Sequence, residues 1–326
     1  MKQRAVRNRT LTIMETEKLQ LLNQTISLSG HVRVGDIENK LIKQDLFKVI
    51  EFLPQQFINL LIIDPPYNLN KTFNGNKFSK TSSENYEVWL ESWLAGLVKS
   101  LKNNASVYVC CDWQSSSSIR KVLEKYFIIR NRITWEREKG RGSFSNWKNC
   151  SEDIWFCTNS EEYQFNVDAV KLKKKVIAPY RDVLGKPKDW EETTDGNYRL
   201  THPSNFWTDI TIPFWSMTEN TDHPTQKPEK LIAKLILASS NLGDFVFDPF
   251  AGSGTTCVVA KKLGRKFSGI EIDEEYCCMA IKRLIRAEND KTIQGYHDGC
   301  FWERNSLNDQ KSSNQEEVTQ IGMRLF

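Results

Sequence analysis

The sequence predicts an α/β fold built on a parallel sheet, and two similar stretches far apart in the chain support this prediction. Residues 58–63 form a short apolar run rich in β-branched side chains, which is typical of a strand buried on both faces of a parallel sheet. Residues 245–247 form a second apolar run, and each run is followed directly by an aspartate and a proline. Apolar residues at helical spacing follow later in both halves, as expected of βαβ units.

The composition is that of an ordinary globular protein. The chain has 326 residues, of which 39% are hydrophobic and 26% are charged, enough for one large α/β domain with an inserted lobe or for two smaller domains. No stretch approaches 18 uninterrupted apolar residues, so we expect no membrane span and a cytoplasmic location. The eight cysteines show no C-x-x-C spacing and the four histidines form no ligand set, so we expect reduced thiols and no bound metal.

Strands and helices alternate along the chain. In order, we expect a short helix at 15–22, a strand at 40–44, a helix at 46–53, the strand at 58–63, a polar loop at 69–85, a helix carrying Trp89, Trp93, Leu97 and Leu101, a strand at 106–111, a helix at 117–126 and a strand at 128–135. The loop at 69–85 is long for a connection, and such loops are usually lids or binding segments.

From residue 136 to about 205 the pattern becomes irregular and basic. Residues 130–188 contain 13 lysines and arginines against 8 aspartates and glutamates, with several aromatic residues between them. Such a run is either an ordinary solvated face or a surface for a phosphate backbone. Only residues 154–157 within it resemble a strand of the main sheet. Beyond Ala287 the chain turns polar, and we expect it to fray.

The turn after the strand at 245–247 has the features of a nucleoside site. Gly252 and Gly254 allow the backbone to approach a ligand at the start of the helix at 257–263. Glu271 ends the next strand, 23 residues after Asp248, where it can bind ribose hydroxyls. No lysine follows the glycines, which excludes a P-loop, and Cys257 replaces the third glycine of a dinucleotide site. A nucleoside without phosphates therefore fits best.

The turn after residues 58–63 can hold an amine. Asp64 supplies a carboxylate, and the carbonyl of a neighbouring proline is a second acceptor, so the two can take both hydrogens of an exocyclic NH₂ group. Tyr67 can stack on the base that carries this amine, provided that the base has left the duplex. The alternative for Asp64-Pro65-Pro66 alone is an ordinary turn at the end of a strand.

With both motifs in view, residues 40–284 resemble the S-adenosylmethionine-dependent amino-methyltransferases of DNA, and more narrowly the β group, in which the catalytic motif precedes the cofactor motif. The resemblance implies a doubly wound, mostly parallel, seven-stranded Rossmann-like sheet with an inserted target-recognition region. It also implies a substrate of double-stranded DNA and, because the motif starts with aspartate, methylation of adenine N6. The resemblance implies catalytic roles for Asp64, Pro65, Pro66 and Tyr67, and cofactor contacts for Asp45, His223, Thr225, Lys227, Asp248, Phe250, Ala251, Gly252, Ser253, Gly254, Thr255 and Glu271.

Several alternatives stay open. Asp45 can serve as a helix N-cap, and His223 can simply bond to backbone at a helix start. Cytosine N4 is the alternative target, a non-catalytic DNA-binding subunit is the alternative class, and an RNA substrate and a companion restriction endonuclease are further possibilities. We expect a monomer or a homodimer. The expected regions are an extension (1–30), a catalytic half (31–135), a target-recognition region (136–205), a cofactor-binding half (206–287) and a polar tail (288–326).

Overall fold

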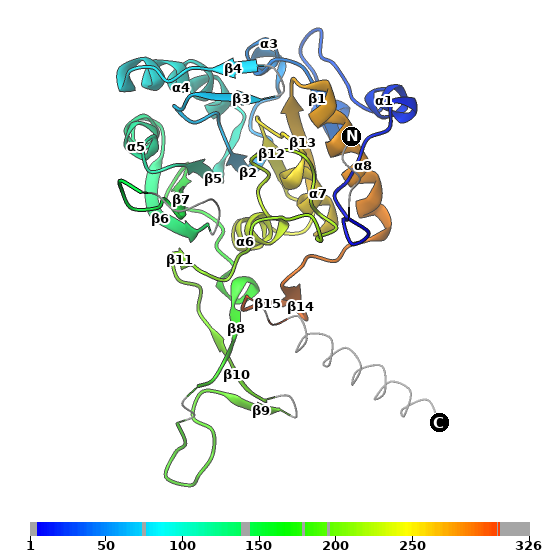
Figure 1. Cartoon of the computed structure of the whole chain (residues 1–326). Coiled ribbons are helices and arrows are strands. Elements are labelled where there is room, and N and C mark those ends of the chain that lie inside the picture. Colours follow the sequence, from blue (N-terminus) through cyan, green and yellow to red (C-terminus); the bar gives the residue numbers. More distant parts are fainter. Residues whose placement is uncertain are drawn as a thin grey trace.

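The computed structural model describes residues 5–73, 76–137, 144–177, 180–193, 196–304 and 306. The charged stretch at 138–143 and the tail beyond residue 306 lie outside the described residues. Within the described residues, the main sheet has eight strands. In spatial order they are β1 (Lys40–Lys43), β13 (Lys266–Glu271), β12 (Phe245–Asp248), β2 (Ile58–Ile63), β5 (Leu101–Cys111), β7 (Ser151–Thr158), β6 (Ile128–Glu136) and β11 (Phe206–Trp207) (Figure 1).

The predicted fold class is confirmed, with one strand more than expected. Neighbouring strands run parallel everywhere except at β7, which is antiparallel to both β5 and β6. The additional strand is β11, whose two residues pair in parallel with Thr134 and Trp135 of β6. A strand of two residues is too short to show a period of two, so no sequence pattern predicted it.

Helices cover both faces of this sheet. The helices are α1 (Glu15–Leu22), α2 (Val34–Ile37), α3 (Leu46–Val49), α4 (Ser83–Val98), α5 (Ser116–Leu123), α6 (Glu229–Ser239), α7 (Thr255–Lys262) and α8 (Glu274–Asn289), with 3₁₀ turns η1 (Ile50–Phe52) and η2 (Val167–Val170). Alternate residues of β2 point to opposite faces. Leu60 and Ile62 belong to the core formed with α6, α7 and α8, whereas Leu61 and Ile63 belong to the core formed with α3, α4 and α5.

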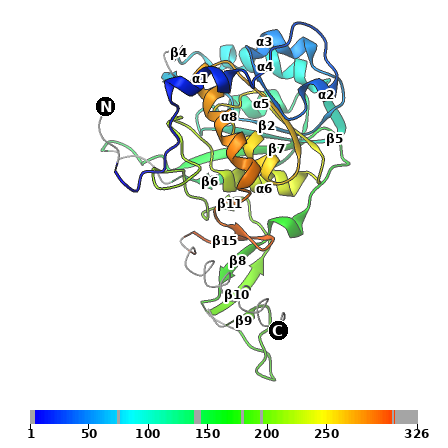
Figure 2. The same ribbon diagram turned by 90° about the vertical axis from the view of Figure 1, so that its right-hand side faces the viewer.

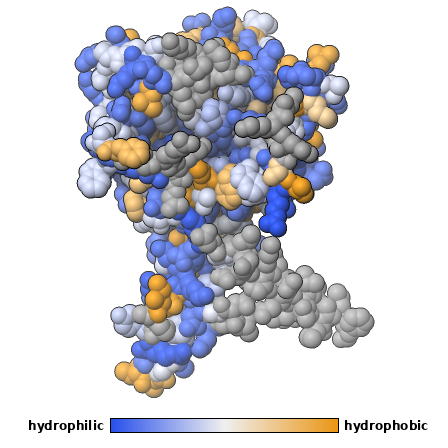
Figure 3. Space-filling view, viewed as in Figure 1, coloured by the Kyte–Doolittle hydropathy of each residue, from blue (hydrophilic) through white to orange (hydrophobic). Residues whose placement is uncertain are grey.

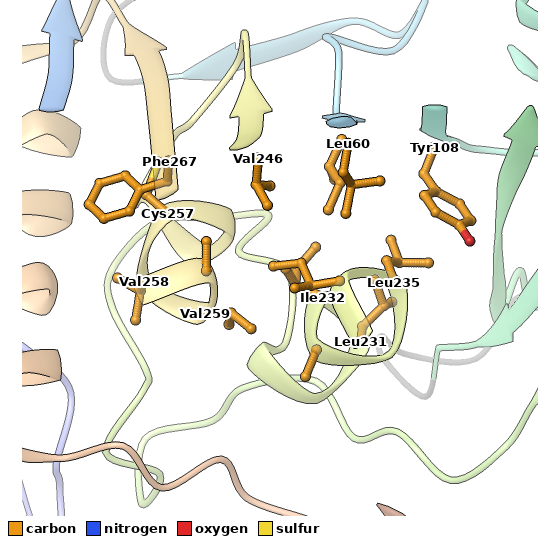
Figure 4. Close-up of a cluster of buried hydrophobic side chains, with 14 of the residues drawn as sticks. Leu60, Tyr108, Leu231, Ile232, Leu235, Val246, Cys257, Val258, Val259 and Phe267 are labelled. Carbon is orange, nitrogen blue, oxygen red and sulfur yellow. The ribbon is translucent and has the colours of Figure 1, made fainter. Parts of the chain in front are cut away.

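Figure 4 shows how the first of these cores is packed. Side chains of α6 and α7 lie against one face of strands β2, β5, β12 and β13. Full burial of each such side chain stabilises the fold by about 1.5–3 kcal/mol. The labelled residues are Leu60, Tyr108, Leu231, Ile232, Leu235, Val246, Cys257, Val258, Val259 and Phe267. This packing fixes α6 and α7 under the ends of β2 and β12, where the two predicted motifs lie.

Several boundaries in the first half of the chain differ from the prediction. Leu101 begins β5 and pairs with Ile58, although its spacing from Leu97 continues a helical pattern. Helix α4 ends three residues earlier, at Val98. The polar loop at 69–85 contains a small hairpin of β3 (Lys71–Phe73) and β4 (Asn76–Phe78), and α4 already begins at Ser83, where the Ser82 hydroxyl accepts a bond from the Asn85 N–H.

A second sheet forms an arm that extends away from the main body (Figures 1 and 2). Within the described residues its order is β14 (Tyr296–His297), β15 (Cys300–Trp302), β8 (Leu172–Lys175), β10 (Gly196–Thr201) and β9 (Glu191–Thr193). The expected fraying beyond Ala287 is therefore wrong for residues 293–302. Phe301 and Trp302 are buried because β15 pairs in parallel with β8, which no local pattern of the C-terminal segment reveals.

The N-terminal extension packs on the main body. Helix α1 lies where it was expected and packs against α8. Leu11 is buried with Tyr276 and Met279 of α8, and the Lys282 ammonium pairs with Glu17. No helix among the described residues is long and apolar enough to cross a membrane.

Candidate active site

The two predicted motifs meet at the point where the strand order of the sheet reverses. β2 and β12 are neighbours, with Leu60 paired to Val246. From β2 the chain proceeds through α4 to β5 on one side, whereas from β12 it proceeds through α7 to β13 on the other. In open α/β sheets, ligands bind outside the carboxyl ends of the strands at such a point. Asp64 directly follows β2 and Asp248 ends β12, so the loops after them lie side by side.

A cavity of about 560 Å³ opens at this edge of the sheet. The sequence-predicted residues that line it are Asp45, Asp64, Pro65, Pro66, Tyr67, His223, Thr225, Lys227, Asp248, Phe250, Ala251, Gly252, Ser253, Thr255 and Glu271. Gly254 is the predicted residue that does not line it. A volume of this size suits a ligand as large as a nucleoside with an attached amino acid.

Hydrogen bonds hold the motif after β2 in place. The Tyr67 hydroxyl donates to Asp64 Oδ1 at 2.8 Å, which ties the ring to the carboxylate. The Tyr86 hydroxyl of α4 donates to the Pro66 carbonyl at 2.9 Å. Burial, followed by the charges of Asp64 and Glu152, raises the pKa of Tyr67, which therefore remains a neutral hydrogen-bond donor. The motif is consequently a fixed surface with a carboxylate at one end.

Lys227 lies at the centre of this surface, on the other side of the carboxylate. Its ammonium donates to Asp64 Oδ2 at 2.7 Å and to the Tyr67 hydroxyl at 3.1 Å, and it lies 3.3 Å from Glu152 Oε2. Burial opposes its charge, but the carboxylates of Asp64 and Glu152 outweigh burial and raise the pKa of Lys227. The structure thus places the Lys227 ammonium against the carboxylate that was expected to hold the amine.

Glycine is required at two positions of the turn after β12. Gly252 has φ +52°, and a Cβ there would lie 2.9 Å from His223 Nε2. Gly254 has φ +78° and caps α7, and a Cβ there would lie 2.6 Å from the Ala280 Cβ. Gly254 therefore lets α7 approach α8 closely, whereas Gly252 lets the backbone pass beneath the His223 ring that borders the cavity.

Two acidic residues border the cavity below this turn. Burial raises the pKa of Asp248 to about 7, although its carboxylate accepts a bond from the Phe250 N–H at 3.0 Å. Burial also raises the pKa of Glu271, whose carboxylate accepts bonds from the N–H groups of Gly252, Ile272 and Asp273 at 2.7–2.9 Å. These bonds orient Glu271 beside β1, since Lys43 pairs with Glu271 in the sheet.

Asp45 caps a helix, and its predicted contact with the cofactor stays a prediction. Its carboxylate accepts a bond from the Phe47 N–H at 3.1 Å and so caps α3, and the residue also lines the cavity. His223 bonds to backbone at Thr225 and packs edge-on against the Tyr276 ring, 4.4 Å between centroids. The structural roles proposed for these two residues are therefore confirmed, and both residues also lie at the cavity where a ligand can reach them.

Comparison with known proteins identifies the chain. A family model described as DNA methylase matches residues 58–282, which is more than half of the chain. The chain belongs to this family of DNA methylases. The DNA adenine methyltransferase YhdJ of Escherichia coli (strain K12) is 33% identical over 259 residues, covering 77% of this chain and 84% of YhdJ. The type II methyltransferase M.HpaI of Haemophilus parainfluenzae is 34% identical over 253 residues, covering 76% of this chain and 74% of M.HpaI.

A solved structure confirms the fold of this DNA methylase. The crystal structure of the M1.HpyAVI–SAM complex superposes with a TM-score of 0.52 at 23% identity, covering 75% of this chain and 98% of that one. DNA methylases of this family take the methyl group from S-adenosylmethionine. The protein is thus an S-adenosylmethionine-dependent DNA methyltransferase.

The cavity of the methylase fits this cofactor chemically. Asp248 is a buried carboxylate whose charge is disfavoured by burial, and a bound cation such as a sulfonium or an amino group would supply a counter-charge. Glu271 is held with its carboxylate at the cavity edge, where it can accept bonds from ribose hydroxyls. Phe250, packed 5.0 Å from the Trp93 ring, and Ile272 supply apolar surface for a flat base.

Sequence reasoning missed three residues that shape this site. Glu152 of β7 is buried and pairs with Lys227 and Arg137. Arg283 of α8 is buried and donates to the Ser253 carbonyl at 2.9 Å, which holds the turn after β12. Tyr86 fixes the Pro66 carbonyl. All three are single polar residues in otherwise ordinary elements, so no local pattern distinguished them.

Proposed function

We propose that this methyltransferase transfers the methyl group to N6 of an adenine that has been flipped out of double-stranded DNA. The observation that carries the proposal is the shared cavity, which is lined both by Asp64 and Tyr67 and by the turn that follows Asp248. One loop offers acceptors and an aromatic face to a base, and the other offers a carboxylate to a cation. Chemistry between a base and a cationic nucleoside needs this juxtaposition.

The residues of the chain act mainly by alignment. Asp64 and the Pro65 carbonyl would accept the two hydrogens of the amine and turn its lone pair toward the cofactor, and Tyr67 would stack on the base. When bound, S-adenosylmethionine supplies an electrophilic methyl group on a sulfonium. Because this group is already reactive, most of the acceleration comes from positioning and from exclusion of water. Asp64 takes up a proton only as the amine becomes acidic during alkylation.

The choice of adenine N6 over cytosine N4 is supported by the Asp-Pro-Pro-Tyr pattern and by a relative that is named a DNA adenine methyltransferase. The same acceptors can bind either amine, so the identity of the methylated base must distinguish the two targets. DNA from cells lacking the gene, incubated with the protein and S-adenosylmethionine, is digested to nucleosides and analysed by mass spectrometry. N6-methyl-2′-deoxyadenosine supports the proposal, and N4-methyl-2′-deoxycytidine in its place would assign the protein to the alternative target.

Substitution of Asp64 tests the role of the site itself. Asp64→Ala should abolish methyl transfer and leave cofactor affinity within about twofold, because the Asp64 carboxylate faces the amine and Asp248 faces the cation. Transfer that survives the substitution would contradict the assignment, and loss of cofactor binding together with turnover would place Asp64 in the cofactor site. A wild-type protein that binds DNA but transfers no methyl group would be a non-catalytic subunit.

We further infer that the arm is the main part of the target-recognition region predicted at 136–205. The strand β8 carries Lys173, Lys174 and Lys175, and the described residues of the arm that are visible in Figure 3 are mostly hydrophilic. Each lysine that neutralises a phosphate contributes about one unit to the salt dependence of DNA affinity. Replacing Lys174 with glutamine should therefore weaken binding similarly for all DNA sequences and reduce the salt slope.

We also infer a cytoplasmic location and a companion restriction endonuclease. All eight cysteines, each within the described residues, are free thiols, which supports a reducing cytoplasmic location. One relative is a type II methyltransferase by name, which supports a companion restriction endonuclease that reads the same site. Extracts of the host that cut DNA prepared without the methyltransferase, but not methylated DNA, would reveal this endonuclease.

A further inference from the structure

Both oxygens of the Asp64 carboxylate are already engaged. Oδ1 accepts the Tyr67 hydroxyl at 2.8 Å, and Oδ2 accepts the Lys227 ammonium at 2.7 Å. The inference that follows rests on the proposed function, in which this carboxylate must accept a hydrogen of the target amine. An ammonium attracts a carboxylate by its full positive charge, which a neutral amine lacks, so Lys227 competes with the substrate for Oδ2.

Lys227 cannot vacate Asp64 by losing its proton. Its side chain is 8% exposed, and the two facing carboxylates raise its pKa despite this burial. A buried ammonium that stays charged needs another anion if it leaves the first one. The structure offers that anion, since Glu152 Oε2 lies 3.3 Å from Lys227 Nζ.

Glu152 is held ready for this second position. It lies on β7 opposite Trp135 of β6, and its side chain is 5% exposed. Its other oxygen, Oε1, pairs with Arg137 Nη1 at 2.5 Å. This ion pair holds the carboxylate in place, and Oε2 is the oxygen nearer to Lys227. The ammonium therefore lies between two carboxylates, closer to Asp64 by 2.7 against 3.3 Å.

We propose that Lys227 is a mobile counter-ion shared by Asp64 and Glu152: without a base it occupies the amine-binding oxygen of Asp64, and when the target base enters it moves onto Glu152. Glu152 is then a positioning residue that acts through Lys227. The exchange keeps the buried charges balanced at every stage, and no proton changes place. It also moves a positive charge away from the amine as that amine becomes positively charged during alkylation, which would otherwise raise the barrier.

Four proteins test the exchange: the wild type, Glu152→Gln, Lys227→Met and the double variant. Each is assayed with unmethylated genomic DNA and tritium-labelled S-adenosylmethionine, and the cofactor Kd is measured separately by calorimetry. In Glu152→Gln the ammonium has only Asp64 left, so kcat/KM for DNA should fall about 10- to 100-fold, the size of one lost charge-assisted bond. The cofactor Kd should stay within about twofold.

The double variant separates this mechanism from a merely structural one. Removing Lys227 from the Glu152→Gln protein takes away the trapped competitor, so kcat/KM should recover at least threefold relative to Glu152→Gln. If Glu152 only stabilises the fold, the second substitution of a buried charge adds damage instead. A double variant that is no better than Glu152→Gln would therefore overturn the proposal.

A control variant distinguishes loss of the exchange from a general loss of stability. Asp209→Asn breaks another buried cluster, in which Lys230 and Lys234 each lie 2.7 Å from Asp209, outside the cavity. It should lower the thermal midpoint without lowering kcat/KM in the surviving folded protein.

Glu152→Asp is the substitute if Glu152→Gln does not fold. It keeps the negative charge on a shorter side chain and should lower kcat/KM for DNA by less than Glu152→Gln would. An unchanged kcat/KM in Glu152→Asp would overturn the proposal. An inactive wild type would refute the proposed function, whereas an active wild type without recovery in the double variant refutes only the exchange.

Discussion

Asp248 connects the stability of this methyltransferase to pH and to its cofactor. The side chain is 4% exposed, and burial raises its pKa from 3.8 to about 7. Because this pKa is higher in the folded than in the unfolded chain, the protonated carboxyl contributes its full stability below about pH 4 and loses it as the pH rises through 7. The difference corresponds to roughly 4 kcal/mol above pH 7. Without cofactor, the ionised Asp248 should therefore destabilise the fold.

The substitution Asp248→Asn isolates this contribution, because asparagine carries no charge and can still accept the Phe250 N–H bond. Urea unfolding of both cofactor-free proteins at pH 5 and pH 8 should show that the wild type loses roughly 2–3 kcal/mol relative to the variant over this range. Glu219 is also buried, with a pKa raised to about 7, but it is present in both proteins and cancels in the comparison. Parallel pH–stability curves for the two proteins would refute the argument.

Cofactor binding should show the opposite trend. A sulfonium or amino group beside Asp248 favours the carboxylate, so S-adenosylmethionine should bind the wild type more tightly at pH 8 than at pH 6. In Asp248→Asn this pH dependence should largely disappear, and the affinity at pH 8 should fall about tenfold or more, the size of one charge-assisted contact. Calorimetric titration at the two pH values measures both effects. Equal affinities for the two proteins would mean that Asp248 does not face the cationic part of the cofactor.

Three further substitutions test other parts of the structure. Gly254→Ala should cost roughly 2–4 kcal/mol of unfolding free energy, because a Cβ would lie 2.6 Å from the neighbouring helix α8. The control Gly243→Ala, at a similar φ of +80° but with open space around it, should cost only about 1–2 kcal/mol. Equal losses in the two variants would contradict the steric argument. Tyr86→Phe removes the donor to Pro66, about 1 kcal/mol, and should lower kcat roughly fivefold with an unchanged cofactor Kd, which steady-state kinetics would show. Phe301→Ala should cost about 3–5 kcal/mol and weaken DNA binding by loosening the arm; unchanged urea unfolding would mean that β15 does not support β8.

The motif loops were predictable because the information is local. An apolar strand followed by Asp64 and prolines, or by Asp248 and glycines, specifies a turn at the carboxyl end of a strand within about ten residues of sequence. Carboxyl ends of parallel strands share one edge of a sheet, which is why the two loops meet at one cavity in the structure. The predicted elements were wrong where the local sequence pattern and the strand pairing disagree. Leu101 has helical spacing but pairs in β5, and the polar C-terminal segment supplies a buried strand.

The sequence by itself determined the fold class and the two loops, because apolar periodicity and turn residues act over short distances. Asp45, His223, Thr225 and Lys227, which also line the cavity, were expected only from the family resemblance. Only the tertiary structure decided which polar side chains meet within that cavity. Lys227 reaches Asp64 across 163 positions of the chain, and Arg283 reaches Ser253 across 30, through contacts that depend on how helices settle on the sheet. A single buried charge leaves no periodic trace in a sequence, so Glu152 and its place beside Lys227 became visible only once the strands were paired.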